Sequence, residues 1–216
     1  MKVFLIGSNG QVGKHIIKFL QESDKHELTA MVRSEEQARQ LQASGVKSVV
    51  ANLEGSVDEL VEAMTGSEAV IFTAGSGGHT GPDKTLLVDL DGAVKSMEAA
   101  EIAGVNRYVM VSAYKAYDRK SWENSPIKPY MVAKHYADKI LVASKLNYTI
   151  LGPGLLSNDP GTGKIAIGED IQKTSIPRED VARTVVAALD EEKTYRKTLE
   201  IMTGDKTVED ALKSIK

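Results

Sequence analysis

The segment Ile6-Gly7-Ser8-Asn9-Gly10-Gln11-Val12-Gly13-Lys14 decides the fold. It follows a short apolar run at residues 3–6 and opens a stretch with helical periodicity, so it joins a buried strand to a helix. Gly7 permits a tight turn, Gly10 lets the backbone approach a pyrophosphate, and Gly13 lets helix and strand pack closely. Free N–H groups at the helix start then face the anion. The predicted dinucleotide contacts here are Gly7, Ser8, Asn9, Gly10, Gln11, Val12 and Gly13.

Three further apolar runs, at 69–73, 108–111 and 148–151, are nearly continuous, as strands buried on both faces of a parallel sheet require. Weaker strands at 28–32 and 46–50 alternate with helices near 11–22, 35–43 and 56–64, which is a βαβαβ order. Helical stripes at 86–100 and 133–144 can cover the sheet. Beyond them we expect a helix near 178–190, a strand near 197–202 and a last helix from about 206. The sequence predicts an α/β, doubly wound parallel sheet.

The 216 residues are interpreted as one domain, with about 1–151 forming a cofactor half and about 152–216 a small substrate cap. A cap of this size suits a small-molecule substrate. The formal net charge of −3 gives no general attraction to nucleic acid or to a membrane surface, and no apolar run is long enough for a span. We expect a cytoplasmic protein, a monomer or small homo-oligomer. Without cysteine, and with no metal-ligand spacing among its histidines, the chain predicts no metal site.

The residue after the second strand distinguishes the two nicotinamide cofactors. An acid at that position binds the ribose 2′-hydroxyl, whereas a base accommodates a 2′-phosphate. Here the residue is Arg33, which favours NADP(H) over NAD(H). Ser34 and Gln37 have the spacing of a capping box for the next helix, and we assign Ser34 to that cap.

The glycine spacing, Arg33 and the segment Tyr130-Met131-Val132-Ala133-Lys134 together resemble the short-chain dehydrogenase/reductase superfamily. The resemblance is to its atypical, extended-like branch of small NAD(P)H-binding proteins, which includes NmrA-like regulators, and it covers nearly the whole chain. In that family the loops after the strands flank the riboses and nicotinamide, and Lys134 would hold the nicotinamide ribose. The resemblance implies further cofactor contacts from Asn52, Leu53, Ala74, Gly75, Lys134 and Pro153.

The chemistry of Tyr130 and Lys134 also follows from their spacing. Residues four apart lie on one helical face, and a nearby ammonium is expected to lower the pKa of a phenol. Tyr130 could then exchange a proton with a carbinol oxygen while a hydride moves at the cofactor. We therefore expect an oxidoreductase that acts on a small carbonyl-like substrate.

The chain departs from the family beside its fifth strand. The family uses the second residue of a Ser-Ser or Ser-Thr pair to polarise the substrate, and this chain has Ser112-Ala113. Ser112 is the remaining candidate polariser, with Lys115 or Tyr114 as replacements, and losing a fixed donor can cost about a hundredfold in rate. Ala113 thus favours an alternative, a non-catalytic redox sensor. A nucleotide-sugar epimerase is a third reading, weakened by the short cap. His79 and Trp122 could also touch substrate, although for His79 a loop position exposed to water is favoured, and local packing explains Trp122 equally well.

Overall fold

The structure, a computed structural model, describes residues 1–168 and 175–216. Its first half alternates strands and helices: β1 (Lys2–Ile6), α1 (Gln11–Gln21), β2 (Glu27–Val32), α2 (Glu35–Ala43), β3 (Lys47–Val50), α3 (Val57–Met64) and β4 (Ala69–Phe72). Next come α4 (Pro82–Lys84), the π-helix η1 (Thr85–Gly92), α5 (Ala93–Ile102), β5 (Arg107–Val111), the 3₁₀ helix η2 (Arg119–Trp122), α6 (Lys128–Ala143) and β6 (Asn147–Pro153). The C-terminal elements are β7 (Leu155–Ser157), β8 (Lys164–Ile167), β9 (Ser175–Pro177), α7 (Arg178–Asp190), η3 (Glu192–Thr194), β10 (Lys197–Thr203), β11 (Lys206–Thr207) and α8 (Val208–Lys213).

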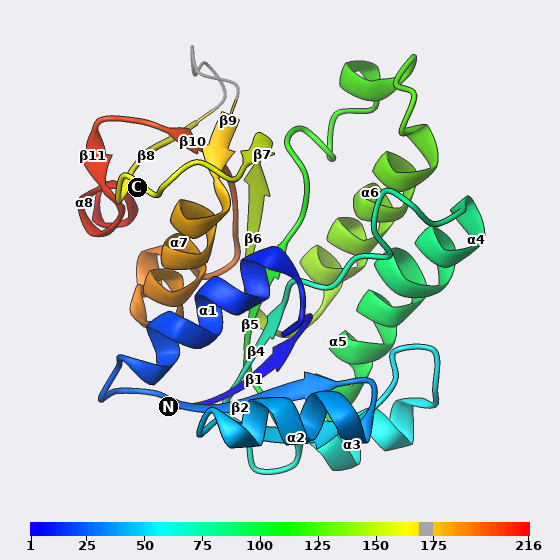
Figure 1. The fold of residues 1–216 in the computed structure, drawn as a ribbon. Helices are drawn as coiled ribbons and strands as arrows, with labels where there is room; N and C mark the ends of the chain where they lie inside the picture. Colours follow the sequence, from blue (N-terminus) through cyan, green and yellow to red (C-terminus); the bar gives the residue numbers. More distant parts are fainter. Residues whose placement is uncertain (169–174) are drawn as a thin grey trace.

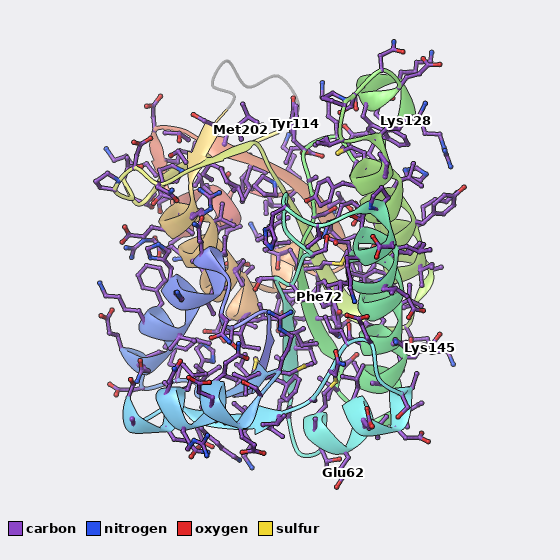
Figure 2. All side chains as sticks on the ribbon, turned by 45° about the vertical axis from the view of Figure 1, so that its right-hand side comes forward. Glu62, Phe72, Tyr114, Lys128, Lys145 and Met202 are labelled. Atoms are coloured by element: carbon purple, nitrogen blue, oxygen red, sulfur yellow. The ribbon has the colours of Figure 1, made fainter. Side chains whose placement is uncertain are left out.

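In the described chain, nine strands form one sheet in the order β11-β8-β10-β6-β5-β4-β1-β2-β3 (Figure 1). The strands from β3 to β10 run parallel, while β8 is antiparallel to β10 and to β11. The carboxyl ends of the parallel strands therefore share one edge, where Tyr114, after β5, and Met202, in β10, lie on the same side (Figure 2). The chain leaves β1 toward β2 and later returns to its other side at β4, which makes the gap between β1 and β4 the topological switch point. This arrangement confirms the predicted doubly wound sheet.

Helices cover both faces of this sheet, which explains why the central strands are apolar at every position. Along β1, Val3 and Leu5 join one core cluster, together with residues of α1, α7 and α8. Phe4 and Ile6 join the other, with residues of α3, α5 and α6. Alternate side chains of one strand thus enter opposite cores, and each must be apolar.

Two sequence predictions about helix faces were wrong. The helical period over 133–144 predicts Tyr136 and Ile140 on the buried stripe, but each is 41% exposed, whereas Lys134 and Asp138 are buried. The period over 86–100 predicts Leu86 on a second buried stripe, but Leu86 is 56% exposed. Leu86 lies in the π-helix η1, where the i→i+5 pattern turns side chains away from the positions that a 3.6-residue period predicts. The short strands β7, β8 and β9 are also not predicted from the sequence.

Candidate functional site

The glycine loop lies at the carboxyl end of β1, beside the switch point. Gly7 has a φ of +94°, and a Cβ there would lie 2.6 Å from the backbone nitrogen of Ala74. The Gly10 N–H donates to the Gly7 carbonyl over 3.0 Å, which closes the turn. A Cβ on Gly13 would collide with that same carbonyl oxygen. Gly7 and Gly13 therefore have the steric roles that their spacing predicts.

Helix α1 begins directly after this loop with its first turn open. Gly10 is its N-cap residue and provides no side-chain hydrogen bond to the backbone N–H groups behind it. Such groups carry the positive end of the helix dipole and bind phosphate oxygens. The buried Ser8 hydroxyl is directed elsewhere, to the carbonyl oxygen of Met31 at the end of β2. Ser8 thus joins the glycine loop to the second strand.

A cleft of about 450 Å³, the glycine-loop cleft, opens between the glycine loop and the loops that follow β2, β3 and β4. Its walls fit a dinucleotide, because the exposed glycine-loop residues Asn9 and Gly10 border it and Arg33 supplies a cation. Several of the predicted cofactor residues line it: Gly7, Ser8, Asn9, Gly10, Arg33, Asn52, Leu53, Ala74 and Gly75. Gln11, Val12, Gly13 and Pro153 do not line the cleft, and of these Val12, Gly13 and Pro153 are buried.

Arg33 is exposed at the end of β2 and lines the cleft. The local turn is fixed from both sides, since the Ser34 hydroxyl accepts from the Gln37 N–H and the Gln37 side chain accepts from the Arg33 N–H over 2.9 Å. The expected cap at Ser34 is present, although Gln37 reaches one residue further back than a standard capping box. This leaves the Arg33 guanidinium, not Ser34, for a ligand.

Tyr130 and Lys134 occupy the first two turns of α6, against the end of β5. Lys134 is 2% exposed, and its Nζ donates to the Val111 carbonyl over 2.8 Å. The Nζ also lies 6.0 Å from the ring centroid of Phe72, the last residue of β4. Because Thr73 and Ala74 follow directly and line the cleft, Lys134 stands behind the cleft wall.

The expected lowering of the Tyr130 pKa does not occur in the structure. Burial raises the pKa of the Tyr130 phenol well above its ordinary value, and the charges of Asp89 and Asp138 raise it further. Burial also lowers the pKa of Lys134, against the opposing influence of the same two carboxylates. The sequence prediction of a lowered phenol pKa considered one ammonium and neither desolvation nor the two anions.

Ser112, the candidate polariser, is bound to the same helix. Its hydroxyl donates to Asp138 Oδ2 over 2.7 Å, and Ser112 is 4% exposed. Burial raises the pKa of Asp138 to about 6, although Lys134 and this hydrogen bond both lower it. Ser112 therefore anchors α6 to β5 in this structure, and Ala113 next to it has no polar side chain to replace it.

Sequence reasoning missed Asp89 and Asp138. Asp89 is 1% exposed within the π-helix, and its Oδ2 accepts from the Ser76 N–H over 2.9 Å, under the loop that lines the cleft. Asp138 could have been found, because it continues the four-residue spacing of Tyr130 and Lys134 on one face of α6. Asp89 could not have been found, since the direction of its side chain depends on the π-helix.

The two further candidates differ in position. His79 is exposed, lines the glycine-loop cleft and packs next to Gly77. Trp122 is 4% exposed and packs with Ala116 and Met131, and its indole N–H donates to the Ala116 carbonyl. His79 thus reaches the cleft, whereas Trp122 stabilises the segment before α6.

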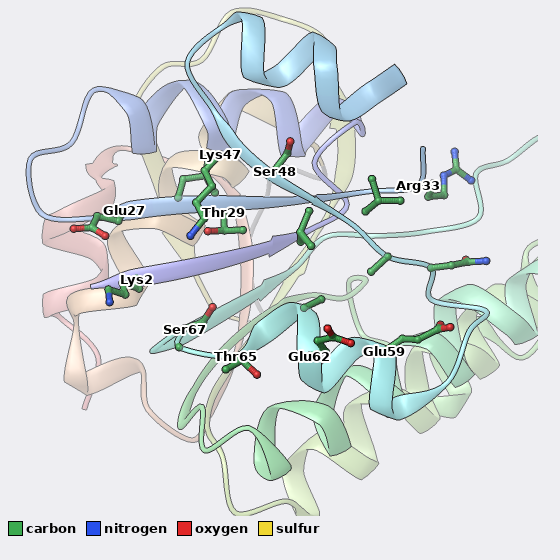
Figure 3. A pocket seen from close by; sticks show the side chains of 17 residues that line it. Lys2, Glu27, Thr29, Arg33, Lys47, Ser48, Glu59, Glu62, Thr65 and Ser67 are labelled. Carbon is green, nitrogen blue, oxygen red and sulfur yellow. The ribbon is translucent and has the colours of Figure 1, made fainter. Parts of the chain in front are cut away.

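A second, larger hollow of about 900 Å³ lies over β2 and the edge strand β3, alongside α3 (Figure 3). Of the described residues, it shares only Arg33 and Asn52 with the glycine-loop cleft. Its labelled residues include Lys2, Glu27 and Lys47 at the amino-terminal ends of β1, β2 and β3, and Glu59 and Glu62 on α3. Because ligands of open α/β sheets bind at the carboxyl ends of strands, we assign the site to the smaller cleft.

Among the described residues, no group of three or more His, Cys, Asp or Glu side chains is placed to hold a metal ion. Likewise, no helix in the described ranges has the length and apolarity needed to cross a membrane.

Comparison with known proteins agrees with this geometry. The sequence profile of the NAD(P)H-binding family matches residues 7–192. The chain is 54% identical over 215 residues to the Bacillus subtilis protein named uncharacterized sugar epimerase YhfK, with all of both chains covered. It is 34% identical to the Lactococcus lactis oxidoreductase ylbE, with a TM-score of 0.91 over 100% of this chain and 96% of the other. A Veillonella parvula short-chain dehydrogenase/reductase, solved in complex with NADP, shares the fold at 20% identity, with a TM-score of 0.73 over 95% of this chain and 96% of the other. The chain therefore belongs to the NAD(P)H-binding family of oxidoreductase- and epimerase-like Rossmann-fold proteins, as its resemblance to the atypical short-chain dehydrogenases/reductases predicted.

Proposed function

We propose that this protein is an NADP(H)-dependent oxidoreductase that acts on a small carbonyl-like substrate. The observation that carries the proposal is the position of Lys134 behind the wall of the glycine-loop cleft, with the partly exposed Tyr130 one turn earlier on α6. When bound, the cofactor supplies a hydride to the substrate carbon. Gly7 and Gly10 give its pyrophosphate access to the backbone, and Arg33 binds the 2′-phosphate.

The residues of this chain supply the proton and the positions. Tyr130 donates its phenolic proton to the substrate oxygen as the hydride reaches the adjacent carbon, and the carbonyl becomes an alcohol. A raised pKa suits this direction, because the phenol keeps its proton until the oxygen becomes basic. Lys134 holds the nicotinamide ribose and stabilises the phenolate that remains. Ser112 reaches a substrate oxygen only after its bond to Asp138 opens, so it is the weakest of the three assignments.

The test is oxidation of NADPH with a panel of aldehydes, ketones and quinones. Tyr130→Phe should lower the rate about a hundredfold or more, as loss of a general acid does. The matched control is Tyr136→Phe, on the same helix, whose exposed hydroxyl accepts from Arg119. A rate that survives Tyr130→Phe unchanged would refute the mechanism.

Two observations favour other functions. The relative named a sugar epimerase suggests a sugar substrate, in which case nucleotide sugars would be epimerised without net consumption of cofactor. The bond of Ser112 to Asp138, next to Ala113, favours a redox sensor, which would bind cofactor without turnover and capture a partner in one redox state only. Parallel assays of net cofactor oxidation and of epimer formation separate all three functions.

A further inference from the structure

The side-chain amine of Lys134 is buried with few hydrogen-bond partners. Its side chain is almost fully enclosed, and within the described residues its one hydrogen bond goes to the Val111 carbonyl. An ammonium has three donors, and burying its charge is costly unless an opposite charge lies close by. The environment of Lys134 must therefore supply that charge.

Two buried carboxyl groups are placed to supply it. Asp138 lies one turn after Lys134 on α6 and is 6% exposed; its Oδ1 has no hydrogen-bond partner within residues 1–168 and 175–216. Asp89 is 1% exposed on η1, which packs against α6. Lys134 and Asp138 also bind consecutive residues at the end of β5, Val111 and Ser112, which fixes them side by side.

We propose that Asp89 and Asp138 are positioning residues for the acid–base pair: from two adjacent helices they hold Lys134 as an ammonium and Tyr130 as a phenol, so that the site donates a proton. This inference rests on the proposed function and adds its direction, reduction of a carbonyl by NADPH. The hydride goes to the carbonyl carbon, the Tyr130 proton goes to the oxygen, and the phenolate is reprotonated from solvent. The direction in which each carboxylate moves the pKa of Lys134 and of Tyr130 agrees with this arrangement.

Within residues 1–168 and 175–216, the charged groups that act on Lys134 are Asp138 on α6 and Asp89 on η1. The end of β5 contributes the Val111 carbonyl to Lys134, and the neutral Ser112 hydroxyl after it binds Asp138. Phe72 adds an aromatic ring from β4. Removing one carboxylate should therefore change the Lys134 titration directly.

The first test needs no turnover. The pKa of Lys134 is measured in the full-length protein by NMR of ¹³C-labelled lysine, with the signal assigned through Lys134→Arg. In Asp138→Asn and in Asp89→Asn this pKa should fall by about one unit or more, as expected for loss of a nearby opposite charge. Both replacements keep an oxygen acceptor, for Ser112 and for the Ser76 N–H respectively, so the local hydrogen bonds can persist. The control is Asp91→Asn, an exposed acid on the same π-helix that pairs with Lys95 over 2.9 Å, and it should leave the Lys134 pKa unchanged.

The second test uses the reduction assay over a range of pH. In Asp138→Asn the pH at which the rate declines on the alkaline side should move down with the Lys134 pKa, whereas a merely structural role would lower the rate equally at every pH. An unchanged Lys134 titration in both variants would overturn the inference, whatever the activity. Shifted titration in a protein without any reductase activity would instead refute the proposed function and leave the charge arrangement established.

Discussion

Replacing Asp138 by Asn should stabilise the folded protein, but only at a pH where the carboxyl is ionised. Burial raises the pKa of Asp138 from 3.8 to about 6 in the folded state. For a group whose folded pKa lies above its unfolded pKa, the stability contribution is complete below the unfolded value and is lost as the pH rises through the folded value. Asn carries no charge and accepts the same hydrogen bond from Ser112, so the variant avoids that loss.

The size of the effect follows from the shift. About two pKa units at roughly 1.4 kcal/mol per unit give a gain of up to about 3 kcal/mol in the free energy of unfolding well above pH 6. Urea denaturation near pH 8 and near pH 4 measures it, with Asp91→Asn as the exposed control. The free energy of unfolding of Asp138→Asn minus that of wild type should be larger near pH 8 than near pH 4, by about 2 to 3 kcal/mol. If the variant is less stable near pH 8 than near pH 4, relative to wild type, the carboxylate is stabilising and the reasoning fails.

Three further outcomes are expected. Gly13→Ala should abolish cofactor binding in a calorimetric titration, because its methyl group would meet the carbonyl oxygen of the glycine turn; full affinity would contradict the tight packing there. Arg33→Ala should weaken NADPH binding about tenfold or more and leave NADH binding unchanged, since a hydrogen-bonded charge contributes roughly 1.5 to 3 kcal/mol; Arg39→Ala, on the exposed side of α2, is the control. Asp180→Ala should lower the free energy of unfolding by about 3 kcal/mol, because this buried carboxylate accepts three hydrogen bonds from the loop 161–163. A decrease in the free energy of unfolding below about 1 kcal/mol, measured by urea denaturation, would show that the loop keeps its structure without the Asp180 carboxylate.

The first strand and the glycine loop after it could be predicted because their signals are local. A continuous apolar run followed by spaced glycines specifies both the strand and the turn after it, and the structure places Gly7 and Gly13 in the conformations that their spacing requires. The strands β7, β8 and β9 carry no such signal. They are three or four residues long, and pairing with partners distant in sequence, such as β8 with β10, makes them strands. Tertiary context decides short segments of this kind.

The acid–base site was only partly readable for a related reason. The helical period brings Tyr130 and Lys134 to one face, which is a local property of α6. The charges that act on them are not local. Asp89 reaches the site from η1, and its position depends on a π-helix that no residue pattern in η1 predicts.

The position of Asp89 connects the two halves of the site. Its carboxylate accepts a hydrogen bond from the Ser76 N–H, in the loop that lines the glycine-loop cleft. The same carboxylate raises the pKa of Lys134 and of Tyr130. A ligand that displaced Asp89 through its hydrogen bond to Ser76 would move an anion relative to the buried Lys134, where electrostatic interactions are strong. A π-helix at this point is consistent with such a role, since these segments are often found at functional sites. Cofactor binding and proton donation are therefore expected to be coupled through one buried residue, and the Lys134 pKa should differ between the free protein and its NADPH complex in wild type more than in Asp89→Asn.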